Sequence, residues 1–355
     1  MSRLLVLFSL MALSRASFAE GLTVEDVMRA FTARAQLIQN STISMDYSYE
    51  SKEHEELRLV KLAHILVSNA ISAAGTKGAK PVPTDNLQLS PERADCTLGA
   101  SGKKYFIKTK DWKETFDGSY FIWRPTGEKA GNFVRLNNAS IRVVPNPLQL
   151  LQLCPLEFEI GFSALFDTEG IPWMELLAKE AKHFILHEVE GDTHLTGRVP
   201  DFKRSILKVD VAFEKKNILR PKSVEVFIGD ESIPEGLWQG GRVDYEGYQS
   251  TAAGDIPSKI VYTGFTSLAY RFDEKELARG KPFFPKDMPV DKRLRTNVNT
   301  FELAHIQVSD TPLPPAAFNV DMNEGTLVYD DITHTSYRFG GEIDSLRKQL
   351  EEHKK

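Results

Sequence analysis

Several features that are common in enzymes and membrane proteins are scarce or missing in this sequence of 355 residues. There are only two cysteines, Cys96 and Cys154, and no CxxC pair or cysteine–histidine cluster surrounds them, which argues against a metal site. No Gly-x-Ser-x-Gly, His-Glu-x-x-His or glycine-rich phosphate motif occurs. The 44 basic and 49 acidic residues give a net charge of −5, without the basic excess of a nucleic-acid-binding protein. We therefore expect no cofactor, no metal ion and no nucleic-acid partner.

Long hydrophobic runs are also missing beyond the N-terminus, and the run at the N-terminus is short. Arg3 precedes an apolar stretch at 4–13, and Ala19 ends a segment with small residues at the positions that a signal peptidase reads. The stretch is too short to span a bilayer. We expect residues 1–19 to be a cleaved signal peptide. The mature protein is then periplasmic or secreted, without a transmembrane segment.

In an oxidising compartment the two cysteines could form one disulfide. Closing the loop between Cys96 and Cys154 would stabilise the protein by about 4 kcal/mol in the chain-entropy picture. Two separate buried thiols are the alternative, because sequence alone cannot place the two Cα atoms within bonding range.

The first elements of the mature chain have clear periodicities. Thr23 can cap a helix over 24–38 whose apolar residues recur at helical spacing, and we place Arg34 on its polar face. In the strand 41–50, Met45 and Tyr47 share the apolar face. A second helix, 52–74, presents Leu62 and Leu66 on one stripe, and a loop rich in glycine, proline and lysine follows it.

The rest of the chain alternates strands with short polar turns. Strands are expected at 103–110, 114–116, 119–124, 132–144, 183–190, 194–198, 207–213, 224–228, 241–248, 259–272, 300–308 and 326–339. Strands in this succession predict an antiparallel, meandering sheet rather than βαβ units. The fold class is therefore mainly β with helices (α+β).

Candidates for catalysis are few. Asp244 and Glu246 share one strand face and could act as paired carboxylates of a hydrolase, with His187 as a further candidate. An exposed sheet face with alternating charges explains the two carboxylates equally well.

Aromatic residues are concentrated between 105 and 133, on three successive strands, and they include Phe106, Phe121 and Trp123. Phe121 and Trp123 should share one face of their strand, while Tyr120 and Ile122 share the other. A sheet that is apolar on both faces needs either a second covering layer or an apolar ligand.

The order of these elements resembles the LolA/LolB-like superfamily of periplasmic lipoprotein carriers. The resemblance rests on the initial helix and strand, on the hairpin segment FDGSYFIW at 116–123 and on the strand PKSVEV at 221–226. It implies a curved, incompletely closed antiparallel β-barrel with a helical lid. Two features depart from the family: Arg220 replaces a leucine before the second motif, and 41–50 lacks the arginine with which the carriers hold their lid.

The resemblance implies a domain organisation and a function. A single LolA-like domain would span 20–341, with an insertion at about 51–95, and 342–355 would form a charged C-terminal helix or tail. The expected function is that of a non-enzymatic carrier that holds the acyl chain of a lipid or lipoprotein, with an envelope protein as a further partner. The candidate residues for the apolar cavity and the lid are Phe31, Met45, Tyr47, Leu62, Leu66, Phe106, Phe121 and Trp123. The alternatives are a secreted hydrolase that uses carboxylates and a structural or interaction module of the cell envelope.

Overall fold

The structure is a computed structural model that describes residues 21–56, 92–102, 104–117, 120–126, 133–137, 147–151, 177–202, 205–214, 217–232, 238–252, 254–267, 293–320 and 322–340. Its helical elements are the α-helices α2 (Val24–Asn40) and α4 (Pro147–Leu151) and the 3-10 helices η2 (Ala181–His183) and η4 (Pro315–Phe318). Its strands are β1 (Thr42–Glu53), β2 (Glu92–Ser101), β3 (Lys104–Lys108), β4 (Trp112–Phe116), β5 (Phe121–Pro125), β6 (Phe133–Asn137), β7 (Phe184–Val189), β8 (Asp192–Phe202), β9 (Ser205–Glu214), β10 (Asn217–Gly229), β11 (Gln239–Thr251), β12 (Gly254–Ser267), β13 (Arg293–Ser309), β14 (Leu327–Asp330) and β15 (Thr335–Arg338).

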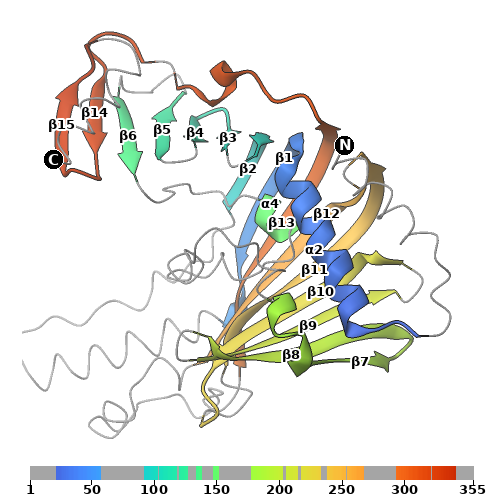
Figure 1. Ribbon diagram of the computed structural model, residues 1–355. Helices are drawn as coiled ribbons and strands as arrows, with labels where there is room; N and C mark the ends of the chain where they lie inside the picture. Colours follow the sequence, from blue (N-terminus) through green and yellow to red (C-terminus); the bar gives the residue numbers. More distant parts are fainter. Residues whose placement is uncertain are drawn as a thin grey trace, which may run out of the picture.

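All fifteen strands belong to one twisted sheet, built from two meanders (Figure 1). Strands β1 to β6 pair in chain order, strands β7 to β13 do the same, and antiparallel pairing of β1 with β13 joins the two series. The chain then returns to the far edge, where β14 pairs parallel to β6. The sheet ends at β15 and β7 and does not close. The mainly β, antiparallel and open architecture is thus confirmed, whereas the helical lid is not.

Helix α2 begins at a capping box and packs on one face of the sheet. The Thr23 hydroxyl accepts a hydrogen bond from the Asp26 backbone N–H at 3.2 Å, and the Asp26 carboxylate accepts one from the Thr23 backbone N–H at 3.3 Å. The buried stripe of the helix is formed by Val27, Met28, Ala30, Phe31, Ala35 and Ile38. We call the sheet face on which α2 packs the inner face, and the opposite one the outer face. Alternation places Ile43, Met45, Tyr47 and Tyr49 of β1 on the inner face, where they belong to the main core with α2.

Arg34 lies within the buried stripe of α2, contrary to the polar face on which the sequence placed it. Its side chain is 3% exposed, and its Nη1 donates to the backbone carbonyl of Asp255 at 2.7 Å. Burial lowers the pKa of this guanidinium, an effect that Tyr248, Tyr245 and Asp255 oppose. The hydrogen bond attaches α2 to the start of β12.

The outer face of strands β5, β6 and β14 has a small core of its own. Ile122, Val134, Leu136, Val320, Val328 and Phe339 are buried together there. The segment that follows β13 covers part of this side of the sheet, and Lys113 of β4 donates to the carbonyls of Ala317 and Asn319 at 3.0 and 2.7 Å. One of the two explanations for a sheet that is apolar on both faces, a second covering layer, therefore applies to this side.

Several predicted segments lie outside the described residues: the signal peptide 1–19, most of the helix 52–74 and the C-terminal tail 342–355. The predicted insertion at 51–95 contains strand at both ends, because β1 extends to Glu53 and β2 begins at Glu92. No helix in the described part of the chain has the length and hydropathy that a membrane crossing requires.

Candidate functional site

Aromatic side chains are concentrated on the inner face of the short strands beyond β2. We call Tyr105, Phe116, Phe121, Trp123, Phe133 and Tyr329 the aromatic stripe. The strand registers place them in two touching groups. Ring centroids lie 5.8 Å apart for Tyr105 and Phe116, 4.7 Å for Phe116 and Phe121, 5.9 Å for Trp123 and Phe133, and 5.8 Å for Phe133 and Tyr329.

The stripe is only partly covered. Tyr329 is 39% exposed and the other five residues are half-buried, while Ile122 between Phe121 and Trp123 is buried on the outer face. The predicted division of β5 into two apolar faces is thereby confirmed for its strand residues. Since the small core on the outer face does not contain these rings, it does not account for them.

The other predicted cavity residues lie elsewhere. Phe31, Met45 and Tyr47 are each at most 2% exposed in the main core, where the Phe31 ring meets Phe213 edge-on at 5.7 Å. They do not line the groove described below, nor a second, smaller pocket beside α2. Phe106 points to the outer face, because Tyr105 and Ile107 on either side of it point to the inner face. Its ring packs on Phe318. Leu62 and Leu66 lie outside the described residues.

Tyr105, Phe116, Phe133 and Tyr329 were not among the predicted site residues. Alternation within their own strands could have placed the first three beside Phe121 and Trp123. Tyr329 has no such local signal, because its strand reaches the stripe only through the parallel pairing of β14 with β6.

Cys96 is a free thiol that is buried on the inner face, so the disulfide considered from the sequence is not formed. Cys154 lies outside the described residues. Burial raises the pKa of the Cys96 thiol to about 11, although a hydrogen bond with Tyr47 lowers it slightly.

A thiol-labelling experiment tests this burial. In the Cys154→Ser variant at about pH 8, Cys96 should react with Ellman's reagent only after the protein is unfolded in urea, because the thiolate is the reactive form. Rapid stoichiometric reaction of the folded variant would contradict the burial of Cys96.

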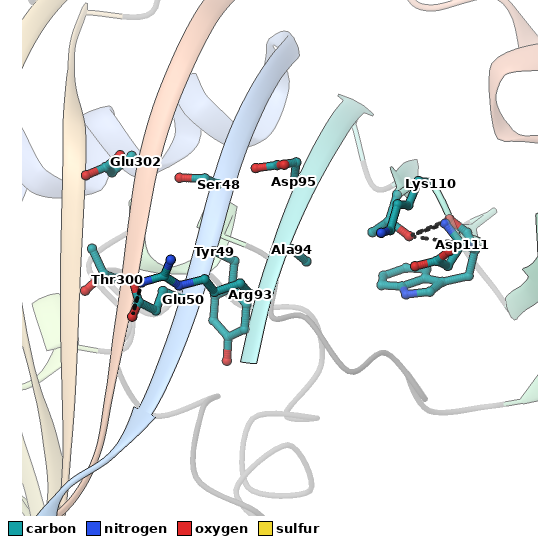
Figure 2. A pocket seen from close by; sticks show the side chains of 12 residues that line it. Ser48, Tyr49, Glu50, Arg93, Ala94, Asp95, Lys110, Asp111, Thr300 and Glu302 are labelled. Carbon is teal, nitrogen blue, oxygen red and sulfur yellow. Dashed lines mark hydrogen bonds and ion pairs between the residues drawn. The ribbon is translucent and has the colours of Figure 1, made fainter. Parts of the chain in front are cut away.

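A groove of about 790 Å³ opens where β3 diverges from β2 (Figure 2). One wall is the first half of β2, and the other is the β3–β4 turn from Thr109 to Trp112. Glu50 and Glu302, from β1 and β13, also line it, and Arg93 pairs with Glu50 at 3.0 Å. Charged and hydroxyl side chains dominate this lining, in contrast to the aromatic stripe.

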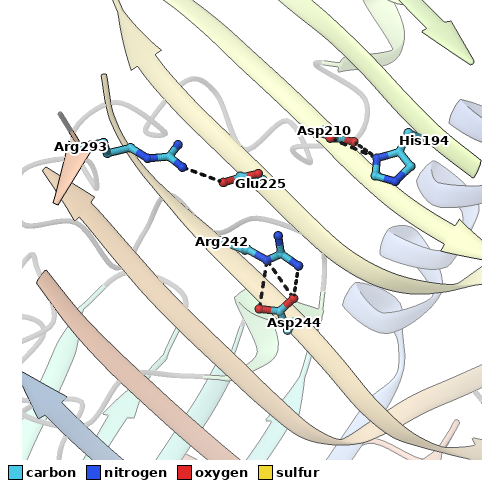
Figure 3. Close-up of polar contacts among 6 residues, drawn as sticks. All are labelled: His194, Asp210, Glu225, Arg242, Asp244 and Arg293. Carbon is cyan, nitrogen blue, oxygen red and sulfur yellow. Dashed lines mark hydrogen bonds and ion pairs between the residues drawn. The ribbon is translucent and has the colours of Figure 1, made fainter. Parts of the chain in front are cut away.

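The outer face of β8 to β13 carries a series of ion pairs (Figure 3). His194 Nδ1 lies 2.9 Å from the Asp210 carboxylate, and Arg293 pairs with Glu225 at 3.4 Å. Burial raises the pKa of Glu225, while Arg293 and Arg242 oppose that shift. The first contact links the neighbouring strands β8 and β9, and the second links β13 with β10, which are separated by β11 and β12. Together they give the outer face its charged character.

The three catalytic candidates from the sequence all belong to this face. Asp244 accepts three hydrogen bonds from Arg242, the shortest at 2.7 Å, and Glu246 accepts one from Lys259 at 2.8 Å. His187 Nδ1 lies 3.3 Å from the Thr196 hydroxyl. Within the described ranges, no group of three or more potential metal ligands is found. Polar contacts with nearby side chains on the sheet face therefore account for these residues.

The comparisons with known proteins show distant structural similarity. No protein-family model matches this sequence, and no curated protein has a significant match to it. Among solved structures, a DUF1329 family protein from Desulfovibrio piger is similar, with a TM-score of 0.38 and 9% sequence identity over 84% of this chain and 98% of that chain. The LolA/LolB resemblance is not confirmed by these findings. At this TM-score the similarity assigns no family and no function.

Proposed function

We propose that the protein is an exported, non-enzymatic binding protein that holds an apolar ligand, the acyl chain of a lipid or lipoprotein, against the aromatic stripe. The observation that carries the proposal is a row of six partly exposed rings on strands whose opposite face has a separate core. Each methylene group that a ligand buries against such a surface contributes about 0.8 kcal/mol. Exposed apolar surfaces of this kind often mark binding sites.

The charged contacts support a role in binding rather than in hydrolysis. Asp244 and Glu246 hold Arg242 and Lys259 on the outer face, on the side of the sheet away from the stripe. Acyl binding through apolar contacts requires none of these groups. The N-terminal signal-like segment and the order of the elements are the features that favour an exported carrier.

The position of the stripe changes the expected binding mode. The sequence predicted a ligand beneath a helical lid, with Phe31, Met45 and Tyr47 among the cavity residues, but those three side chains are buried in the main core. In the proposed mode the acyl chain lies beside the main core, along β4, β5 and β6, and α2 acts as a fixed part of the fold.

Native mass spectrometry of the full chain, purified from the periplasm of a bacterial host, tests the proposal. We expect a co-purified lipid that organic extraction releases. Rebinding of a fluorescent fatty acid should change little between about pH 6 and pH 8, because no histidine belongs to the stripe. A hydrolase should instead convert an ester with a bell-shaped pH profile. If the protein carries no lipid and does not bind the fatty acid, the structural-module alternative is favoured.

A further inference from the structure

Strand β2 is paired along its whole length on one side but only partly on the other. Its residues 92–101 pair with β1, whereas its pairing with β3 starts at Thr97. The cause is the short β3–β4 hairpin: Thr109 accepts a hydrogen bond from the Trp112 backbone N–H at 3.1 Å and closes the turn there. No described strand continues along the edge of residues 92–96. Backbone N–H and C=O groups at such an edge can pair with another extended chain.

The groove described above lies at this edge, and its volume of about 790 Å³ is within the range of ligand-binding clefts. Five strand residues span about 16 Å, so a short extended segment matches the length of the edge. The groove and the edge thus favour a peptide in strand conformation over a compact small molecule.

The charges of the groove indicate what such a peptide should carry. Four carboxylates line it, those of Glu50, Asp95, Asp111 and Glu302, against the two cations Arg93 and Lys110. Asp95 and Arg93 point to the outer face, while Ala94 and Cys96 point to the inner one. A strand added beside β2 would therefore place alternate side chains next to Asp95 and the others next to the small Ala94 and the Trp112 wall.

We propose that the groove binds an extended segment of a partner protein in which basic and apolar residues alternate, and that this segment adds to the edge of β2 as a further strand. Main-chain hydrogen bonds to β2 supply affinity, and the carboxylates select basic side chains. This site is separate from the aromatic stripe, so the acyl-binding proposal can fail without affecting it.

Fluorescence anisotropy with the full chain and a labelled acetyl-KVKVKVK-amide peptide tests the proposal at about 0.15 M salt. We expect saturable binding that Asp95→Lys weakens at least tenfold, because an exposed carboxylate beside the edge becomes a cation. The matched control is Glu324→Lys, which makes the same charge change at an exposed turn outside the groove. It should leave the affinity within twofold.

Two further peptides separate strand addition from simple charge attraction. A peptide of the same sequence with alternate backbone amides N-methylated should lose binding at least tenfold when the methyl groups face β2, because those N–H groups can no longer donate. A glutamate-for-lysine peptide should not bind. Equal binding of the N-methylated or the acidic peptide, or undiminished binding by Asp95→Lys, would overturn the proposal. Self-association of the chain that Asp95→Lys abolishes would assign the edge to a second copy instead.

Discussion

The Phe31→Ala variant is expected to unfold with a free energy about 3–5 kcal/mol lower than that of the unsubstituted protein. Phe31 is fully buried on α2, and its ring contacts Phe213 of β9 edge-on. Removing the ring leaves a cavity between helix and sheet that the surrounding strands cannot readily close. Equilibrium urea unfolding, followed by far-UV circular dichroism, measures the difference.

Arg29→Ala on the same helix is the matched control. The Arg29 side chain is 68% exposed and pairs with Asp26 one turn earlier, so the change should stay within about 0.5 kcal/mol. A loss well below 2 kcal/mol for Phe31→Ala would instead indicate a loosely packed helix. That result would support the prediction that α2 is a lid that moves over a cavity.

The second large effect concerns the ligand. The double variant Phe121→Ala/Trp123→Ala is expected to bind a fluorescent long-chain fatty acid about tenfold to a hundredfold more weakly. Full burial of a large apolar side chain contributes about 1.5–3 kcal/mol, and 1.4 kcal/mol corresponds to a factor of ten in affinity. Titration by fluorescence measures the dissociation constant. The double variant should also lose less unfolding free energy per residue than Phe31→Ala does, because both rings are half-buried.

Phe106→Ala controls for the loss of an aromatic side chain from the same group of strands. Phe106 also lies on a short strand, but it faces the outer side and packs on Phe318. The Phe106→Ala variant should be less stable than the unsubstituted protein, but its affinity for the fatty acid should be unchanged. Equal loss of affinity in the control and the double variant would argue against the aromatic stripe as the binding surface.

Local alternation was enough to predict much of the sheet. Leu207, Val209 and Val211 of β9 are buried as their spacing indicates, and they face Ile228, Val226 and Val224 of β10 across an antiparallel register. On α2, Val27, Met28, Phe31, Ala35 and Ile38 are likewise buried. In these segments a large apolar side chain at each inward position produces an unmistakable period.

Strand β2 and Arg34 show where that period fails. The inward positions of β2 include the small residues Ala94, Cys96 and Ala100. The inner and outer faces of this strand therefore differ little in hydrophobicity. Arg34 was assigned to the solvent because of its charge, although its spacing of three from Phe31 and four from Ile38 places it on the buried stripe. In both cases the position of a residue in its element determined which way its side chain points, whereas the size or charge of the residue suggested otherwise.

The contacts that create the candidate sites are mostly non-local. The pairing of β14 with β6 brings Tyr329 to the aromatic stripe, and the pairing of β1 with β13 brings Glu302 to the groove. A single sequence carries no periodic signal for which strands become neighbours. The predicted strand 326–339 is also a hairpin, because Asp330 accepts hydrogen bonds from the Ile332 and Thr333 backbone N–H groups and turns the chain there.

The joining of the two meanders also bears on the order in which the protein can fold. The Tyr49 hydroxyl on β1 donates to Asn299 on β13, across 250 residues of sequence, and α2 contacts β10. Domains that depend on such distant pairings fold slowly, and a ribosome delivers the N-terminal partners first. The apolar faces of α2 and β1 therefore cannot pack against β10 and β13 until most of the chain has been synthesised. We expect α2 and β1 of the nascent chain to stay exposed during that time and to be bound by chaperones, before any ligand is bound.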